Sequence, residues 1–294
     1  MSDAVITSSE QSIAQGSQSF ATAARLFDRR TRDDVIDGQT LGHDQADDFR
    51  DGQQNRLGLL RQQTAAALRG GQTNEPVFEA LRRVVDRHQI PARHPEELLT
   101  GFEMDVVDRS YATIEDTLDY CYHVAGVVGV MMAMIMGVRD PRVLDRACDL
   151  GIAFQLTNIA RDVVEDARAG RCYVPADVLA RHGISEIDLD DSAQRAHLHA
   201  AAVELLDLAE AYYQSAYQGL ASLPPRSAWA IATARRVYRA IGTKLRTAGP
   251  NAWDKRVSTT KAEKAALLSV ALGDVARSRL RMQEVPRQGL WQRP

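Results

Sequence analysis

The stretch GIAFQLTNIARDVVEDARAGRCYVP, residues 151–175, decides the fold. Its helical periodicity extends back to Pro141 and forward to Ala169, and Gly170 follows. Proline at the first position of a helix and glycine just past its end are common boundaries. We therefore predict one helix over 141–169, with about 29 residues and a length of about 43 Å.

Helical patterns recur along the rest of the chain, whereas the period-2 alternation of strands is almost absent. Thr113 and Asp116 predict a capping box at the start of a helix that carries the uncharged run 124–138. The breaks between the patterns are short. We expect one all-α domain over 1–294, with a short flexible N-terminus at about 1–10 and a C-terminal tail at about 283–294. The other predicted helices cover 77–85 and beyond as far as Pro91, 191–218, 226–247 and 260–281.

Composition sets limits on function. A chain of 294 residues with 45% hydrophobic content can bury a sizeable core. The net charge of -3 gives no overall reason to expect nucleic acid. From Arg226 onward, however, 15 Lys and Arg face 4 Asp and Glu, which indicates either a solvated basic face or attraction to phosphates or an anionic membrane.

Cysteines and apolar runs exclude other classes. The 3 cysteines have no C-x-x-C spacing, so they support neither a disulfide framework nor a zinc site. No secretory signal is visible at the N-terminus, and we expect a cytoplasmic protein. The longest uncharged run, 124–138, is shorter than the roughly 20 residues that span a bilayer, and we interpret it as a buried helix.

An acidic stripe lies on the predicted long helix. Gln155, Asn158, Asp162 and Asp166 are spaced by three or four residues, so they share one face. Like charges one turn apart weaken a helix, which suggests that a ligand outside the helix needs them. Amide and carboxylate oxygens suit Mg2+, which usually takes one or two carboxylates beside phosphates and waters. The alternative is a solvated helix face.

A second acidic cluster is the segment DDVID, in which Asp33, Asp34 and Asp37 share one side if the segment is helical. Two such clusters on facing helices would let metal ions bridge both to one diphosphate and neutralise it as it leaves. Gly126 and Gly129 would then leave a groove for a hydrocarbon chain, although close packing against another helix is the interpretation that spacing alone favours.

Longer motifs carry a family resemblance. YCYHVAGVVG (120–129), the opening stretch 151–175, GSQSF (16–20) and RSAWAIATARRVYR (226–239) resemble the signatures of the squalene and phytoene synthase family, and look most like its bacterial phytoene synthases. The similarity runs over nearly the whole chain. It implies an all-α isoprenoid-synthase bundle with a central apolar cavity, a transferase of prenyl groups. The implied reaction joins two geranylgeranyl diphosphates head to head, through a cyclopropyl diphosphate, to give phytoene, the first committed step of carotenoid biosynthesis.

The resemblance also implies roles for individual residues. Metal ligands would come from both acidic motifs, with Asn158 beside the second, and the metal would be Mg2+, or Mn2+ in its place. Tyr120 would lie near the reacting carbons. The residues implied as metal ligands are Asp33, Asp34, Asp37, Asn158, Asp162 and Asp166, and those implied at the substrate are Ser17, Ser19, Arg30, Gln155, Arg161, Tyr238 and Arg256.

The chain departs from the family before its first aspartate motif. Relatives carry a helical segment with the pattern Y-x-x-x-R-x-x-D-D there, whereas LFDRRTR joins DDVID directly in this chain. Arg30 keeps the R-x-x-D-D spacing, but Leu26 occupies the tyrosine position. The sequence looks shortened between Arg32 and Asp33 by roughly a dozen residues, or about 18 Å of helix.

Several alternatives remain open. A chain-elongating prenyl synthase would need lysines to bind its second diphosphate. The 4 lysines of this chain all lie late in the sequence, from Lys244 onward. A squalene-type enzyme would need NADPH, which phytoene formation does not. A shortened relative that only binds or has a structural role is a third alternative, whereas a di-iron bundle would need E-x-x-H pairs that the chain does not contain. Expected partners are geranylgeranyl diphosphate, the inner face of the cell membrane and other carotenoid-pathway enzymes, without nucleic acid.

Overall fold

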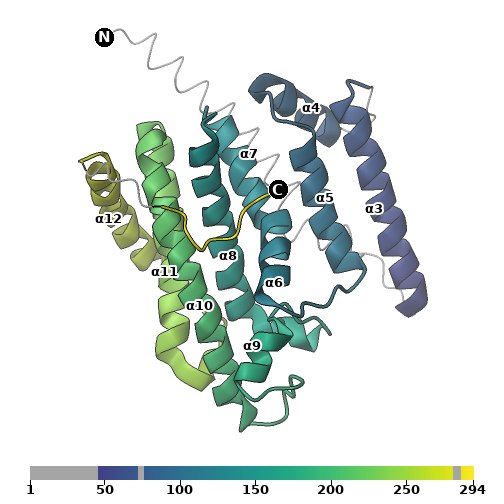
Figure 1. The fold of residues 1–294 in the computed structure, drawn as a ribbon, viewed down its shortest axis with the longest axis vertical. Coiled ribbons are helices and arrows are strands. Elements are labelled where there is room, and N and C mark those ends of the chain that lie inside the picture. The colour runs from purple at the N-terminus through teal and green to yellow at the C-terminus, as the bar shows by residue number, and fades with distance from the viewer. Residues whose placement is uncertain (1–45, 72–75, 281–285) are drawn as a thin grey trace. The chain divides into compact units, whose positions relative to one another are not determined.

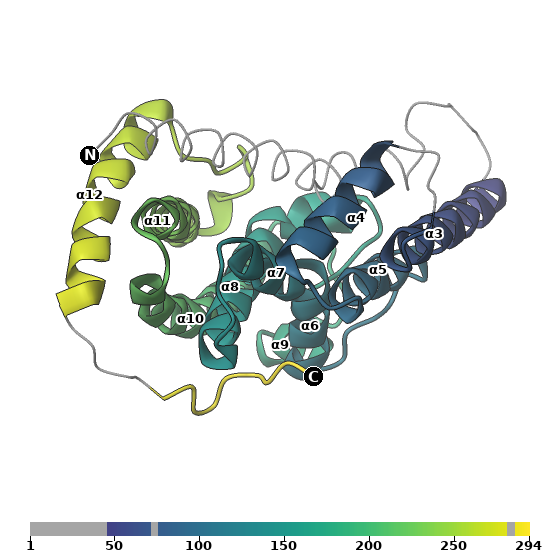
Figure 2. The same ribbon diagram turned by 90° about the horizontal axis from the view of Figure 1, so that it is seen from above.

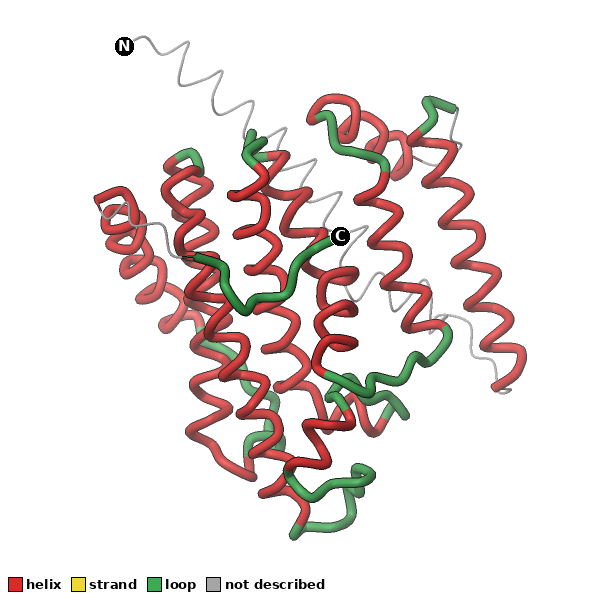
Figure 3. Tube along the Cα trace, in the orientation of Figure 1, coloured by secondary structure: helices red, strands yellow, loops and turns green. Residues whose placement is uncertain are grey.

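The computed structural model describes residues 46–71, 76–280 and 286–294, and every regular element in these ranges is a helix (Figure 3). The all-α prediction is therefore confirmed for the described chain. The chain divides into two compact units at Val107/Asp108. They are treated separately below, and the single domain expected over 1–294 stays a prediction.

The first unit contains three described helices, α3 (Ala46–Leu68), α4 (Pro76–His88) and α5 (Arg93–Val106). Phe78, Leu81, Val84 and Val85 on α4 are buried and form one apolar stripe along the helix predicted from residue 77. Helix α3 packs on both α4 and α5. The described part of this unit is stabilised by apolar packing and carries surface ion pairs such as Arg61–Glu103, in which Nη2 and Oε2 are 2.7 Å apart.

The second unit is built around one long helix, α8, which lies between α7 and α10 (Figure 1). Seen from above, α11 lies between α12 and α10 (Figure 2). The C-terminal residues cross α10 and α8 on one face of the unit. The elements are α6 (Ile114–Cys121), η1 (Tyr122–Gly126), α7 (Val127–Ile135), α8 (Pro141–Arg168), α9 (Ala176–Arg181), α10 (Gln194–Gln218), η2 (Gly219–Ser222), α11 (Pro225–Ala248), η3 (Gly249–Asn251) and α12 (Lys261–Leu280).

Local signals set both ends of α8. Asp140 accepts a hydrogen bond from the Arg142 backbone N–H at 2.9 Å, and Pro141 opens the helix. At the other end Gly170 has a φ of 74°, and the Arg171 N–H donates to the Asp166 carbonyl at 2.9 Å. This pairing is a Schellman cap, which favours glycine because an L side chain is strained at positive φ. The helix thus ends one residue before the predicted Ala169.

The uncharged run differs from its prediction in one respect. The predicted capping box is present, since Asp116 N–H donates to Thr113 Oγ1 and Thr113 N–H to the Asp116 carboxylate. The helix it opens is interrupted by η1, a π-helical turn. Ile114–Ile135 is long and apolar enough to cross a bilayer, but 56% of its most apolar window is buried inside the protein, as a core helix would be.

Glycines bring η1 and α7 against the backbone of α8. A Cβ added at Gly129 would lie 2.3 Å from the Ala147 carbonyl oxygen, and one at Gly151 would lie 2.2 Å from that of Ala125. No larger residue fits at these two contacts without moving a helix. The glycines therefore serve close helix packing, and the alternative of a hydrocarbon groove at Gly126 and Gly129 is not what the structure shows.

Candidate active site

The C-terminal half of α8 carries the predicted polar stripe. Asn158 lies between Gln155 and Asp162, and its Nδ2 donates to Gln155 Oε1 over a long 3.4 Å. Its Oδ1 is buried, and among the described residues nothing donates a hydrogen bond to it. A buried oxygen without a donor costs free energy in the folded protein. A hard cation is the kind of ligand that would satisfy it.

Asp162 is the buried acid of the stripe, with 3% of its surface exposed. Arg161 Nε donates to its Oδ1 at 2.8 Å, and Arg256 Nη2 lies 3.4 Å from the same oxygen. Burial opposes the charged form of Arg161, but the hydrogen bond and charge of Asp162 outweigh it and raise the Arg161 pKa. Two cations therefore gather at one buried carboxylate.

Arg256 reaches the stripe from the loop after η3. Its Nη1 donates to Glu165 Oε2 at 2.7 Å, so the guanidinium bridges Glu165 and Asp162 across one turn of α8. Trp253 anchors this loop, since its Nε1 donates to the Ala160 carbonyl at 3.3 Å. The side chain of Arg256 is 59% exposed, so this end of the site is open to solvent.

An aromatic group lies at the N-terminal end of the stripe. The Tyr238 ring from α11 stacks on the Phe154 ring at 4.1 Å, with 25° between the planes. Phe154 also lies 6.1 Å from the Tyr213 ring, whose hydroxyl is 2.8 Å from Thr157 Oγ1. These contacts give the polar stripe an apolar neighbour drawn from three helices, α8, α10 and α11.

A second aromatic cluster surrounds the predicted Tyr120. Its ring is 1% exposed and stacks on that of Tyr173 at 4.8 Å, while the Tyr111 ring lies 5.3 Å away. Thr117 on the same helix donates its hydroxyl to the Tyr173 carbonyl at 3.0 Å. Three buried tyrosine rings thus pack together at the helix that carries the 120–129 motif, with Tyr120 and Tyr173 stacked and Tyr111 tilted against them.

Part of the predicted site lies within the described residues. It brings together Gln155, Asn158, Arg161, Asp162 and Arg256, and it places Asp166 one turn beyond Asp162 on the same helix. Tyr238 joins them through Phe154 on α8. In the ranges that the structure describes, no three His, Cys, Asp or Glu side chains gather to hold a metal ion. Ser17, Ser19, Arg30, Asp33, Asp34 and Asp37 lie outside the described residues.

Sequence reasoning missed several side chains that shape this region. Phe154, Tyr213, Tyr173 and Trp253 each contact a predicted site residue or its helix. Phe154 is four residues before Asn158 and so continues the polar stripe, a signal that the sequence contained. The others come from distant segments, and no local pattern marks them.

Known proteins match this chain over most of its length. A family model described as "Squalene/phytoene synthase" matches residues 13–263. The chain is 53% identical to a 15-cis-phytoene synthase of Paracoccus sp. (strain N81106 / MBIC 01143), over 100% of this chain and 99% of that protein. It is also 50% identical to a 15-cis-phytoene synthase of Pantoea ananas, over 97% and 96% respectively.

Two further findings concern shape and length. A dehydrosqualene synthase crystal structure with a bound ligand superposes with a TM-score of 0.75 at 26% identity, covering 90% of this chain and 88% of that one. The alignment with the Paracoccus protein runs over 307 positions, and all 294 residues of this chain take part. At least 13 aligned positions therefore have no residue here, and the shortening before Asp33 stays a prediction.

Proposed function

The chain belongs to the squalene/phytoene synthase family, and from this premise we propose that it is a 15-cis-phytoene synthase. The observation that carries the proposal is identity of 50% or more to bacterial proteins of that name over nearly the whole chain. The substrate would be geranylgeranyl diphosphate, two molecules of which are joined head to head through a cyclopropyl diphosphate. The final product, phytoene, needs no hydride, so NADPH would not be required.

Asn158, Asp162 and Asp166 would hold Mg2+, or Mn2+, on α8, and Asp33, Asp34 and Asp37 would supply the facing ligands. The buried Asn158 oxygen without a donor in the described chain supports this fit. When bound, the metal would neutralise the negative charge that develops as diphosphate leaves. The ligand set from the first motif remains a proposal, since those residues lie outside the described ranges.

The arginines and Tyr238 would grip the diphosphate, with Ser17, Ser19 and Arg30 from the N-terminal motif. Arg161 and Arg256 already converge on Asp162, so an arriving anion would meet two guanidinium groups in fixed positions. A planar guanidinium binds phosphate oxygens through paired N–H donors. Gln155 would orient Asn158 through their mutual hydrogen bond.

Tyr120 and its aromatic neighbours would hold the reacting carbons away from water. An allylic cation formed on ionisation must meet the second substrate's double bond before it meets water, and a dry wall in fixed geometry favours that outcome. No protein nucleophile is required. The departing diphosphate can take the final proton, so no residue is assigned that role.

Product analysis tests this proposal. We expect the purified chain with geranylgeranyl diphosphate and Mg2+ to form phytoene at the same rate with and without NADPH. A reduced product that requires NADPH would favour the squalene-type alternative. No product from this chain, together with phytoene from a version lengthened before Asp33 to match the Paracoccus protein, would favour the shortened, non-catalytic alternative.

We place the protein in the cytoplasm, peripheral at the inner face of the membrane and in contact with other carotenoid-pathway enzymes. The exposed side of α12 supports the membrane part, since Leu268, Val270 and Leu272 are exposed between the lysines near its start and the two arginines of its last turn. Flotation with anionic liposomes should show binding at low salt and less at high salt. Absence of binding at low salt would contradict it.

A further inference from the structure

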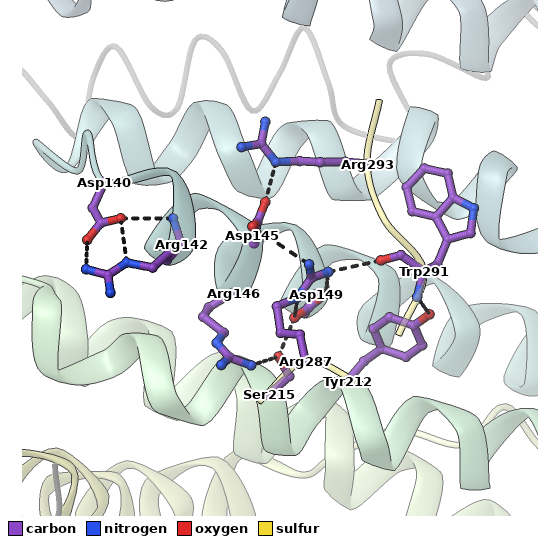
Figure 4. Close-up of polar contacts among 10 residues, drawn as sticks. All are labelled: Asp140, Arg142, Asp145, Arg146, Asp149, Tyr212, Ser215, Arg287, Trp291 and Arg293. Atoms are coloured by element: carbon purple, nitrogen blue, oxygen red, sulfur yellow. Dashed lines mark hydrogen bonds and ion pairs between the residues drawn. The ribbon is translucent and has the colours of Figure 1, made fainter. Parts of the chain in front are cut away.

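The C-terminal residues 286–294 dock on the N-terminal half of α8 through contacts to Asp145 and Asp149 (Figure 4). This half of the helix precedes the polar stripe, which begins at Gln155. Arg287 donates to both carboxylate oxygens of Asp149, at 2.8 and 2.7 Å. Arg293 Nε donates to Asp145 Oδ1 at 2.6 Å, one turn earlier on the helix. Two arginines from the end of the chain therefore pair with two acids on one face of α8.

Asp149 makes this contact more than a surface ion pair, because none of its surface is exposed. Ser215 on α10 also donates its hydroxyl to the Asp149 carboxylate, and Arg146 donates to Ser215 Oγ at 2.7 Å. A buried carboxylate needs both a charge partner and hydrogen bonds to offset its lost hydration. Arg287 supplies the charge, so the end of the chain is part of the buried structure of the unit.

Trp291 joins this segment to the π-helical turn. Its ring lies 5.2 Å from that of Tyr122, the first residue of η1, and its backbone N–H donates to the Tyr212 hydroxyl at 3.1 Å. Arg287 Nη2 also donates to the Trp291 carbonyl at 3.0 Å, so one guanidinium links the backbone at Trp291 to Asp149 on α8.

The other end of η1 rests on the same turn of α8. A Cβ added at Gly126 would lie 3.0 Å from Cys148 Sγ, and Cys148 adjoins Asp149. Tyr120 lies two residues before Tyr122 in the helix that runs into η1. π-Turns often occur at functional sites, and this one contacts the C-terminal segment at one end and α8 at the other.

We propose that residues 286–294 are a positioning element for the reaction centre: Arg287 fixes the segment on α8, and Trp291 holds Tyr122 so that η1 keeps Tyr120 in place. This inference rests on the proposed function for its link to catalysis. Trp291 is a positioning residue, because it contacts Tyr122 and not the reacting groups.

The test compares Trp291→Ala with Trp291→Phe in the full chain. The phenylalanine keeps a ring against Tyr122 and leaves the backbone N–H in place. We expect Trp291→Ala to lower kcat by roughly 10- to 100-fold with little change in KM, since a displaced group costs rate more than affinity. Trp291→Phe should restore kcat to within about 3-fold of the native value, because the aromatic contact survives.

Hydrogen exchange gives a second reading that does not depend on turnover. With Trp291→Ala, amide exchange should rise at least about 10-fold within 120–126 and stay unchanged in α12, since local opening would be confined to η1 and its neighbours. Arg142→Ala is the matched control. It removes the ion pair between Arg142 and Asp140 at the start of α8, and that pair is exposed. Neither kcat nor amide exchange in 120–126 should therefore change.

The outcomes separate this inference from the proposed function. Unchanged exchange in 120–126 would overturn the positioning role even if activity falls, and so would a uniform rise across α10, α11 and α12. Raised exchange in 120–126 with unchanged kcat would contradict the link to the reaction. A native chain that forms no phytoene from geranylgeranyl diphosphate would count against the proposed function. Hydrogen exchange would still decide whether Trp291 holds η1.

Discussion

The two halves of α8 carry polar networks in opposite conditions. In the N-terminal half, Asp145 and Asp149 are paired with Arg293 and Arg287, and Ser215 completes the hydrogen bonds of Asp149 (Figure 4). In the C-terminal half, Asn158 Oδ1 is buried without a donor among the described residues. The same helix thus holds one completed polar network and one incomplete one.

The difference separates stability from function. A buried network with every group paired rigidifies the fold. Removing one member leaves a charge or a polar atom buried without a partner, which lowers the stability of the folded protein. A network that lacks a partner lowers stability slightly and leaves room for a ligand. We interpret the first half as structural and the second as the ligand-binding half, and substitutions in the two halves should therefore differ in what they damage.

Removing Arg287 should have the largest effect. Arg287→Ala would leave Asp149 buried without its charge partner, and we expect a loss of about 3–5 kcal/mol in the free energy of unfolding. Urea unfolding followed by circular dichroism measures it. Asp149→Asn in the same chain should recover part of the loss, and a loss under about 1 kcal/mol for Arg287→Ala alone would contradict a buried, paired carboxylate.

Removing Asp162 should damage activity instead. Asp162→Ala takes away the carboxylate on which Arg161 and Arg256 converge, and we expect phytoene formation to fall at least about 100-fold, or about 2.7 kcal/mol in the barrier. Helical content should stay close to native. Asp166→Ala should behave alike, and near-native activity in both variants would refute the metal role. If the native chain is inactive, the lengthened version is the background for both.

Two substitutions of uncharged polar residues, one in each network, compare the two halves directly. Ser215→Ala removes a hydroxyl that both donates to Asp149 and accepts from Arg146, and should cost about 1–3 kcal/mol of stability. Asn158→Ala loses only a long hydrogen bond to Gln155, and its cost should stay under about 1 kcal/mol while product formation falls. Equal stability losses in the two unfolding curves would mean that the halves do not differ as described.

An exposed pair in the same unit should show the smallest effect. The hydrogen bond from Lys244, with those from Thr260, lowers the Glu263 pKa from 4.5 to about 2. A carboxylate with a lowered pKa in the folded state stabilises it above pH 4.5 and loses that effect as the pH falls toward 2. The gap in unfolding midpoint between native and Glu263→Gln chains should therefore narrow over this range, and a constant gap would contradict the pairing.

Local signals in the sequence predicted much of the fold. Pro141 and Gly170 predicted both ends of α8 to within a residue, and Thr113 with Asp116 predicted the capping box, because these residues act on their own backbone. The polar stripe followed from helical spacing alone. The resemblance to the family supplied Arg256, which the structure places beside Asp162.

Features that depend on distant contacts were not predictable in this way. The π-turn at Tyr122–Gly126 forms where Gly151 admits the Ala125 carbonyl, a contact between separate helices. The C-terminal residues looked like a tail, yet Arg287 pairs with an acid 138 positions earlier in the chain. Periodicity and capping carry no information on such partners.

The proposed function requires the C-terminal half of α8 to bind diphosphate through a divalent cation. Calorimetric titration of geranylgeranyl diphosphate into the native chain and Asp162→Asn, each with and without Mg2+, tests it most directly. We predict that Mg2+ tightens binding to the native chain and has little effect on binding to Asp162→Asn. Affinity that is independent of Mg2+ in the native chain, or enhanced equally in both chains, would contradict the claim.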